Sequence, residues 1–195
     1  YTWRAAGVRA CIWNQRSGAI ARMPHALEKG ASRRMSAFIA NSPAGLDFLT
    51  GTLKVPKEKI ALIPNGIELS DRSPEGRRTV RQKLGIDEGA LVAAMIGNLR
   101  EPKDQETLIR AWPAVMAHME RQGRSAVLLL IGRIFDEYAF LPKLAETLAG
   151  EQAVRFTGYQ DDVKALLSAV DISVFSSDSE GLPNGVMESM AAGLP

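Results

Sequence analysis

The sequence predicts an α/β fold built on doubly wound parallel sheets, and two observations carry this prediction. Short apolar segments alternate with longer amphipathic segments along most of the chain, which is the pattern of strand–helix–strand units. The apolar segments are also continuous, as in VLLLI at 127–131, rather than interrupted by polar residues. Continuous apolar runs are typical of strands that are buried on both faces of a parallel sheet.

The first third of the chain contains three predicted strands and two predicted helices. We expect strands at 8–13, 37–40 and 60–63, and helices at 20–35 and from Pro43 onward. The turn signal Pro64-Asn65-Gly66 ends the last of these strands. The polar segment 67–80 follows, contains Pro74 and Gly76, and predicts a linker into a second unit.

The second unit alternates strand and helix more regularly. We expect strands at 90–96, 127–131, 154–157 and 172–175, and helices at 104–121, 137–149, 161–169 and from Asn184 onward. The helix at 104–121 contains Pro113, which predicts a kink or a break there. This alternation predicts an open sheet with helices on both faces.

Composition and charge exclude several classes of protein. The net charge of the 195 residues is +2, and the 24 Lys and Arg are expected to be spread along the chain. The run Arg77, Arg78 and Arg81 predicts a solvated helix face rather than a nucleic-acid patch. One cysteine and two histidines provide neither a disulfide nor a zinc-ligand spacing, which suits a reducing cytosol. No apolar stretch reaches the roughly 20 residues that span a bilayer.

The C-terminal segment 177–195, SDSEGLPNGVMESMAAGLP, is the most informative part of the chain. Glu180 and Glu188 have seven residues between them, and the turn GLPNG at 181–185 lies in that interval. A strand, a Gly/Pro turn and a helix N-terminus together form an anion site, because free backbone N–H groups and the helix dipole favour negative charge. Phosphate-binding amides beside two carboxylates that accept from hydroxyls are suited to a nucleotide sugar.

Paired carboxylates also occur in glycoside hydrolases, where they lie about 5–10 Å apart. Seven intervening, mostly helical residues separate the two backbones by roughly 12 Å at 1.5 Å per residue. The spacing of Glu180 and Glu188 therefore fits two parts of an elongated ligand better than the two sides of one bond.

The segment EGLPN…E, followed by AAGLP, resembles the signature of family-four retaining glycosyltransferases of the GT-B fold. The resemblance implies that Glu188 binds the ribose hydroxyls of the donor and that Glu180 lies near the transferred sugar and the diphosphate. It further implies that the intervening turn contacts phosphate or sugar oxygens through its backbone, at Gly181, Leu182, Pro183, Asn184 and Gly185; Pro183 itself has no N–H to donate.

The segment GNLREPKD at 97–104 resembles the loop of this family whose Arg and Lys hold the diphosphate. Lys103 matches the family's lysine, whereas Asn98 occupies the position of its arginine and Asp104 that of a glycine. The resemblance therefore assigns Lys103 and, as a substitute guanidinium, Arg100 to the diphosphate, with Gly97 and Asn98 lining the donor site. Two cations there would take the place of a metal ion.

Two further segments resemble the family. The loop FTGYQDD at 156–162 implies contacts with the nucleobase from Gly158, Tyr159 or Gln160. The segment IPNGIE at 63–68 resembles the family's hinge between its two Rossmann-like domains. The implied division is the end of an acceptor-binding domain at 1–64, a linker at 65–89 and an incomplete donor-binding domain at 90–195.

The resemblance implies a retaining, metal-independent glycosyltransferase of hexosyl type that uses a nucleotide diphosphate sugar and needs no cofactor. The acceptor would be a saccharide or a lipid-linked saccharide, in bacterial cell-surface polysaccharide synthesis. A cytoplasmic location follows, with attachment at the inner face of the membrane left open and no nucleic-acid partner expected. Two alternatives also stay open, namely a nucleotide-sugar epimerase of similar fold and a non-catalytic nucleotide-binding fragment.

Overall fold

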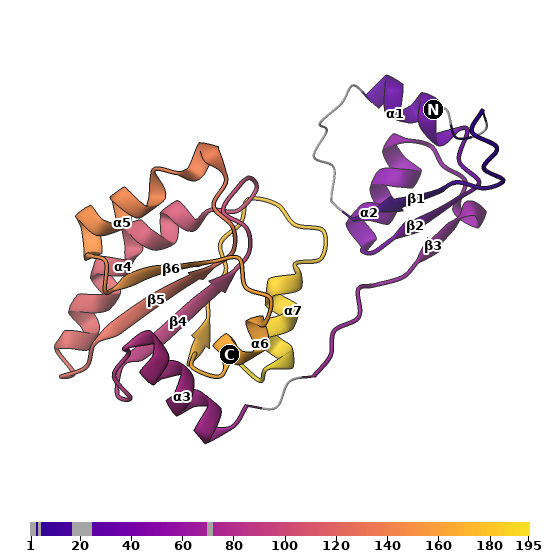
Figure 1. Cartoon of the computed structure of the whole chain (residues 1–195). Coiled ribbons are helices and arrows are strands. Elements are labelled where there is room, and N and C mark those ends of the chain that lie inside the picture. Colours follow the sequence, from indigo (N-terminus) through magenta and orange to yellow (C-terminus); the bar gives the residue numbers. More distant parts are fainter. Residues whose placement is uncertain (1–2, 4, 17–24, 70–71) are drawn as a thin grey trace. The chain divides into compact units, whose positions relative to one another are not determined.

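The computed structural model of the chain describes residues 3, 5–16, 25–69 and 72–195 (Figure 1). The chain divides into two compact units. The first comprises Tyr1–Gly66 together with Ser179–Pro183, and the second comprises Ile67–Asp178 together with Asn184–Pro195. Each unit contains one parallel sheet, so the predicted fold class is confirmed.

The first unit holds a three-stranded sheet in the order β1-β2-β3, formed by Ile12–Gln15, Ala37–Ala40 and Ile60–Leu62. Helix α1 (His25–Ser32) precedes β2, and α2 (Pro43–Asp47) follows it and continues into the π-helical turn η1 (Phe48–Thr52). A short 3₁₀ turn, η2 (Lys57–Lys59), leads into β3. The core of this unit packs Phe38 against Phe48, Leu49 and Leu53.

Two elements of the first unit differ from the prediction. Strand β1 begins at Ile12, four residues later than the expected start at residue 8. The first residues of the predicted strand, including Val8, are exposed and do not pair with the sheet. The predicted helix 20–35 is observed only as α1, and residues 20–24 of that prediction lie outside the described residues.

The second unit holds a four-stranded parallel sheet in the order β6-β5-β4-β7. Its strands are β4 (Leu91–Ile96), β5 (Ala126–Ile131), β6 (Val154–Gly158) and β7 (Ile172–Ser173). Its helices are α3 (Pro74–Leu84), α4 (Gln105–Glu120), α5 (Leu141–Ala149), α6 (Val163–Leu167) and α7 (Asn184–Ala191). A 3₁₀ turn, η3 (Asp136–Tyr138), precedes α5. Pro113 does not break α4, which is continuous through it.

Successive residues of β4 and β5 pack into two separate cores, as expected for strands that are covered on both faces. Met95 and Leu130 pack against Trp112 and other residues of α4 and α5. Val92 and Leu129 point to the opposite face and pack with residues of α6 and of the segment that follows α7. Figure 1 shows α4 and α5 on one face of the sheet, and α3, α6 and α7 on the other.

The segment expected to be a linker, 65–89, contains helix α3. Ser73 caps its start by accepting a hydrogen bond from the N–H of Gly76, and Gly85 ends it in the left-handed conformation. The prediction that Arg81 lies on a solvated face is wrong, because Arg81 is fully buried. Its guanidinium donates to Ala169 O and Ala90 O and pairs with Asp171 at 2.8 Å, so α3 is fastened to the sheet.

Candidate functional site

The strand order of the second unit reverses direction between β4 and β7, and the carboxyl ends of these two strands mark the candidate site. The chain moves from β4 outward to β5 and β6, then returns to the other side of β4 to form β7. Doubly wound sheets bind ligands at this point of reversal, outside the carboxyl ends of the strands. The segments that follow the two strands, 97–104 and 174–178, therefore border the candidate site.

These two segments are fastened to each other by hydrogen bonds. The N–H of Asp178 and the hydroxyl of Ser177 both donate to Pro102 O at 2.9 Å. The N–H of Asp104 donates to Ser176 O, and the Ser176 hydroxyl donates back to Asp104 O. The loop that carries Lys103 is thus held in a fixed position beside the end of β7.

Lys103 lies at the reversal point itself. Its Nζ is 4.4 Å from the ring centroid of Phe175, a cation–π distance. Its Cε passes Gly97 so closely that a Cβ at that position would lie 3.1 Å away. The sequence analysis gave Phe175 no role. Its position could have suggested one, because it is an aromatic residue at the carboxyl end of a predicted strand.

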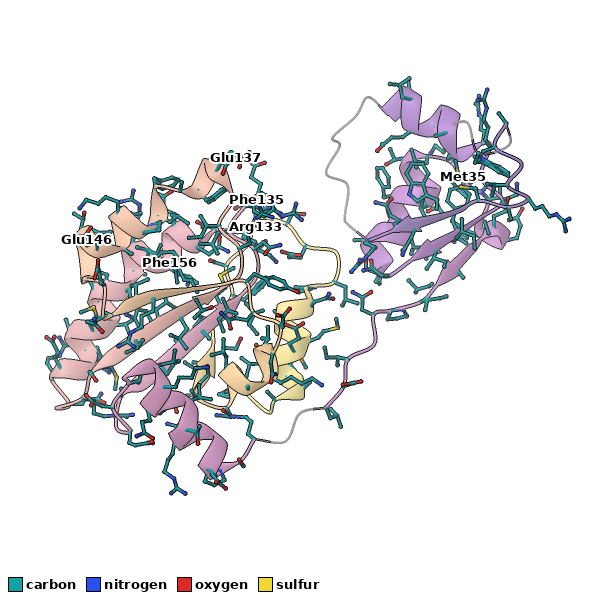
Figure 2. The ribbon with its side chains drawn as sticks, viewed as in Figure 1. Met35, Arg133, Phe135, Glu137, Glu146 and Phe156 are labelled. Carbon is teal, nitrogen blue, oxygen red and sulfur yellow. The ribbon has the colours of Figure 1, made fainter. Side chains whose placement is uncertain are left out.

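Arg100 is directed to a different aromatic ring from Lys103. Its guanidinium carbon lies 5.4 Å from the ring centroid of Phe135. The guanidinium carbon of Arg133 lies 5.4 Å from the same centroid, and Arg133 and Phe135 are labelled in Figure 2. Arg133 follows β5 at the same edge of the sheet and is exposed, but the sequence analysis gave it no role. The structure therefore adds a third cation to the two that were predicted.

Asn98 connects the loops after β4 and β5. Its Oδ1 accepts a hydrogen bond from the N–H of Arg133 at 3.1 Å, and its backbone O accepts from the Gln105 amide at 3.3 Å. Its side-chain oxygen is therefore occupied in holding the loop that presents Arg133.

Helix α7 approaches the sheet closely because its inner face is made of small residues. A Cβ on Gly185 would lie 2.3 Å from Ile96 O, so only glycine fits there. The Ser173 hydroxyl donates to Ser189 Oγ at 2.8 Å, and the Ser189 hydroxyl donates to Gly185 O at 2.8 Å. These contacts fix the position and rotation of α7, and with them the position of Glu188.

Glu188 is a half-buried carboxyl group, and its burial raises its pKa above the ordinary value. Within the described part of the chain, its carboxylate has neither a hydrogen bond nor an ion pair. Burial without a partner costs stability, and such groups are common at functional sites. Glu188 can therefore accept hydrogen bonds from a ligand.

The predicted nucleobase loop follows β6, at the far side of the sheet. Gly158 has a φ of +68°, which favours glycine, and the Gln160 amide donates to Thr157 O at 2.6 Å. Tyr159 is 71% exposed at this edge. Strand β6 is two strands from β4, roughly 10 Å at the usual spacing, which matches the length of an elongated ligand.

The predicted EGLPN turn is divided between the two units. Glu180, Gly181, Leu182 and Pro183 belong to the first unit, whereas Asn184, Gly185 and Glu188 belong to the second. The residues that follow β4 and β6 and the residues of α7 therefore belong to the second unit, whereas Glu180 is assigned to the first.

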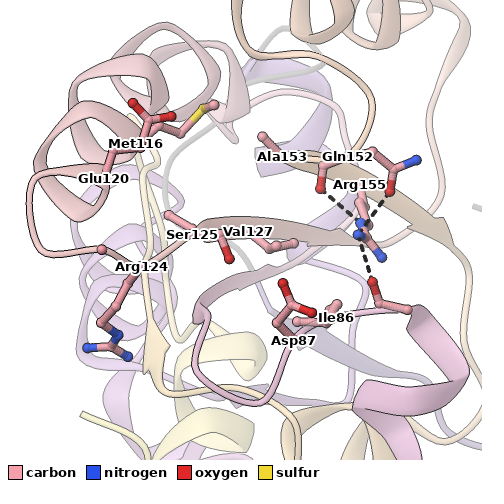
Figure 3. A pocket seen from close by; sticks show the side chains of 13 residues that line it. Ile86, Asp87, Met116, Glu120, Arg124, Ser125, Val127, Gln152, Ala153 and Arg155 are labelled. Carbon is pink, nitrogen blue, oxygen red and sulfur yellow. Dashed lines mark hydrogen bonds between the residues drawn. The ribbon is translucent and has the colours of Figure 1, made fainter.

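A separate pocket of 480 Å³ lies at the opposite edge of the second sheet (Figure 3). Ile86, Met116, Val127 and Ala153 contribute apolar walls, and Arg155 closes one side. Arg155 donates to Gln152 O at 3.0 Å and to the carbonyl of Leu84, so its guanidinium serves the fold. No predicted site residue lines this pocket.

The described residues contain no group of three or more His, Cys, Asp or Glu residues that could hold a metal ion. None of their helices combines the length and apolarity that a membrane span requires.

The fold consists of two Rossmann-like units, and the candidate site lies at the carboxyl edge of the second sheet. The chain belongs to the group 1 glycosyl transferase family, which it matches over residues 76–195. Residues 5–71 match the Glycosyltransferase Family 4 domain.

Among curated proteins, the chain is similar to D-inositol 3-phosphate glycosyltransferase of Actinosynnema mirum, with 29% identity over 166 residues. That alignment covers 80% of this chain and 39% of the relative. The lipopolysaccharide core biosynthesis glycosyltransferase LpsE of Rhizobium meliloti is 38% identical over 118 residues, covering 59% of this chain and 31% of LpsE. The chain thus spans about two fifths of the length of such relatives or less.

Solved structures of similar fold include HepE and WaaG. HepE of Anabaena, in complex with UDP, superposes with a TM-score of 0.79 at 23% identity, over 100% of this chain and 54% of HepE. WaaG, a glycosyltransferase of lipopolysaccharide biosynthesis, superposes with a TM-score of 0.75 at 19% identity, over 99% of this chain and 60% of WaaG. The fold is that of GT-B glycosyltransferases.

Proposed function

We propose that this chain is part of a retaining glycosyltransferase that transfers a hexosyl group from a nucleotide diphosphate sugar to a saccharide or lipid-linked saccharide. The observation that carries the proposal is the meeting of the Lys103 loop with the end of β7 at the point of strand reversal. Family membership supports it, as do two similar proteins: LpsE, which is named for lipopolysaccharide core biosynthesis, and a UDP-Gal:alpha-D-GlcNAc-diphosphoundecaprenol alpha-1,3-galactosyltransferase of Escherichia coli.

In the proposed reaction, the bond between the anomeric carbon and the diphosphate oxygen breaks. The acceptor oxygen bonds to the anomeric carbon on the same face, and its proton passes to the departing diphosphate oxygen. Negative charge builds on the departing diphosphate. Lys103, Arg100 and the backbone amides at the start of α7 would stabilise this charge, because preorganised donors act most strongly where charge develops. Glu188 would accept hydrogen bonds from the ribose hydroxyls, and Glu180 would lie near the transferred sugar.

The nucleobase would lie at the end of β6, against Tyr159 and Gln160. HepE has been solved in complex with UDP and with UDP-glucose, which makes a UDP-sugar the first donor to test. Cell-surface polysaccharide synthesis and a cytoplasmic location complete the proposal.

The test is a transfer assay with the full-length protein and labelled nucleotide sugars. A transferase forms a glycosylated acceptor, an epimerase converts the free donor, and a binding module does neither. Donors are first screened by thermal shift, because a ligand at 100 times its Kd stabilises by about 2.7 kcal/mol. Converted donor without a glycosylated product would replace this proposal with the epimerase alternative.

Metal independence is tested in the same assay. If Lys103 and Arg100 neutralise the diphosphate, transfer should continue when EDTA is added. Activity that is lost with EDTA and restored by manganese or magnesium would contradict this part of the proposal.

A further inference from the structure

Arg133 follows strand β5, which lies between β4 and β6 in the second sheet. A donor with its diphosphate at the end of β4 and its nucleobase at the end of β6 must cross the end of β5. Adjacent strands are about 5 Å apart, so the residues after β5 lie one strand spacing from each of these positions. Arg133 is therefore placed beside the middle of such a ligand.

The backbone of Arg133 is held by the residues that follow β4. Its N–H donates to Asn98 Oδ1 at 3.1 Å, and its O accepts from the N–H of Leu99 at 2.9 Å. Two residues further on, the N–H of Phe135 donates to Leu99 O at 3.2 Å, and Leu99 forms a parallel bridge with Ile134. The pairing of β4 with β5 thus continues past the ends of both strands, and it satisfies both backbone polar groups of Arg133.

Gly132 connects the same loop to its neighbours on both sides. Its N–H donates to Gly158 O, at the end of β6, at 3.0 Å. A Cβ on Gly132 would overlap Gly97 O, so glycine is needed for the two backbones to approach this closely. Gln105 of α4, which is 1% exposed, supports the loop after β4 by donating to Asn98 O. Arg133 is therefore presented from a backbone that is fixed on both sides.

The guanidinium of Arg133, unlike its backbone, is not used by the fold. Among residues 3, 5–16, 25–69 and 72–195 it forms neither a salt bridge nor a side-chain hydrogen bond, and its side chain is exposed. It lies 5.4 Å from the ring centroid of Phe135. A guanidinium that packs on an aromatic ring keeps its N–H donors, and these donors match the oxygens of a phosphate in a bidentate arrangement.

We propose that Arg133 binds the phosphate on the nucleoside side of the donor's diphosphate. This inference rests on the proposed function, from which it takes the positions of the diphosphate and the nucleobase. Lys103 packs on Phe175 after β7 and passes over Gly97 after β4, farther from β6 than Arg133. Lys103 therefore serves the phosphate on the sugar side, from which the sugar departs.

Asn98 is a positioning residue in this arrangement. It occupies the place of the family's arginine, and its side-chain oxygen holds the backbone of Arg133. The guanidinium that is missing at position 98 is thus supplied from the neighbouring strand, through the residue that replaced it.

The two cations should have different kinetic signatures. The nucleoside-side phosphate carries its charge before and after transfer, so its contact with Arg133 is equally strong in the ground state and the transition state. Such a contact lowers KM and leaves kcat unchanged. Arg133→Ala should therefore raise the KM for the donor on the order of 10-fold at a kcat close to that of the wild type, whereas Lys103→Ala lowers kcat.

The experiment is isothermal titration of the full-length protein with UDP and with UMP, which retains only the nucleoside-side phosphate. Arg133→Ala should weaken the binding of both nucleotides by a similar factor, on the order of 10-fold. Lys103→Ala should weaken UDP binding and leave UMP binding close to that of the wild type. Arg133→Lys should restore part of the loss, because an ammonium keeps the charge without the planar fork.

The matched control is Arg78→Ala, which removes the same charge at an exposed position of α3 and should bind both nucleotides like the wild type. Asn98→Ala tests the positioning role and should also weaken UMP binding. The double variant Asn98→Ala/Arg133→Ala should bind no more weakly than Arg133→Ala, because Asn98 acts through Arg133. Additive losses would mean that Asn98 contacts the nucleotide itself and would overturn its positioning role.

Three results would overturn the assignment of Arg133. Wild-type binding of UDP and UMP by Arg133→Ala would do so and would leave the proposed transfer reaction untouched. A loss of UDP binding with unchanged UMP binding would move Arg133 to the sugar-side phosphate. A wild-type protein that binds neither UDP and UMP nor GDP and GMP would overturn both this inference and the nucleotide-sugar donor of the proposed function.

Discussion

Two arginine environments in the second unit differ in how their charges are satisfied. Arg81 is fully buried, and every nitrogen of its guanidinium donates to a carbonyl or to Asp171. Arg100 and Arg133, at the carboxyl edge of the sheet, are exposed and lie over Phe135 without a carboxylate partner among the described residues. Arg81, whose donors are all used within the protein, holds this fold together. Arg100 and Arg133 have donors that remain available to a ligand.

Asp171 and Glu188 show the same contrast between a buried charge that is paired and one that is not. Burial raises the pKa of Asp171, but the N–H of Val92 and the ion pairs with Arg77 and Arg81 outweigh it and hold the pKa below its ordinary value. Burial alone acts on Glu188 and raises its pKa. Asp171 therefore stabilises the folded state above its unfolded pKa, and this contribution is lost as the pH falls through its folded pKa.

The largest expected effect is at Arg81. Arg81→Met should lower the free energy of unfolding by about 3–5 kcal/mol, because it leaves several buried carbonyls and Asp171 without their donor. Urea unfolding followed by circular dichroism measures the loss. The control is Arg78→Met, an exposed position on the same helix, which should stay within about 0.5 kcal/mol of the wild type. Equal effects at both positions would contradict the contrast drawn above.

The next effect is at Gly185, where helix α7 meets β4. Gly185→Ala should destabilise by about 1–3 kcal/mol, because its Cβ would lie 2.3 Å from Ile96 O and would push α7 outward. The displaced helix should also bind UDP more weakly, which isothermal titration measures. Gly51→Ala serves as the control, since a Cβ there meets nothing within 4 Å. Tight UDP binding by Gly185→Ala would mean that the position of α7 does not control the site.

A third prediction concerns Lys103 and Arg100. Lys103→Ala should reduce kcat of the full-length enzyme more than it weakens donor binding, and Arg100→Ala should do so to a lesser degree. The stability of Arg100→Ala should be within about 0.5 kcal/mol of the wild type, because its side chain is exposed. Lys143→Ala is the control for a surface lysine. Wild-type turnover in Arg100→Ala would mean that Lys103 and backbone amides alone hold the diphosphate.

The smallest effect on stability is expected at Glu188, and its sign is opposite. A raised folded-state pKa means that ionised Glu188 disfavours folding, and this cost appears as the pH rises through the folded pKa. Glu188→Gln should therefore be slightly more stable than the wild type at neutral pH and no different below the unfolded pKa of about 4.3. Thermal unfolding across pH measures this, while UDP titration should show weaker binding. Equal stability of Glu188→Gln and the wild type at all pH values would show that the ionised carboxylate of Glu188 does not destabilise the folded state.

The sequence by itself determined the alternation of elements, and with it the fold class. The continuous apolar runs at β4 and β5 and the exact bounds of β2 were predictable, because fully buried parallel strands leave a strong local signal. The loop 97–104 and the α7 segment could also be located, because glycine, proline and charge between a strand and a helix mark the carboxyl edge of such sheets.

Only the tertiary structure decided which charges are buried and which rings the cations meet. Arg81 belongs to a polar run that looks solvated in sequence, and its partners lie 88 and 90 residues away at Ala169 and Asp171. Phe175 and Phe135 become partners of Lys103 and Arg100 through strand order, which no local pattern encodes.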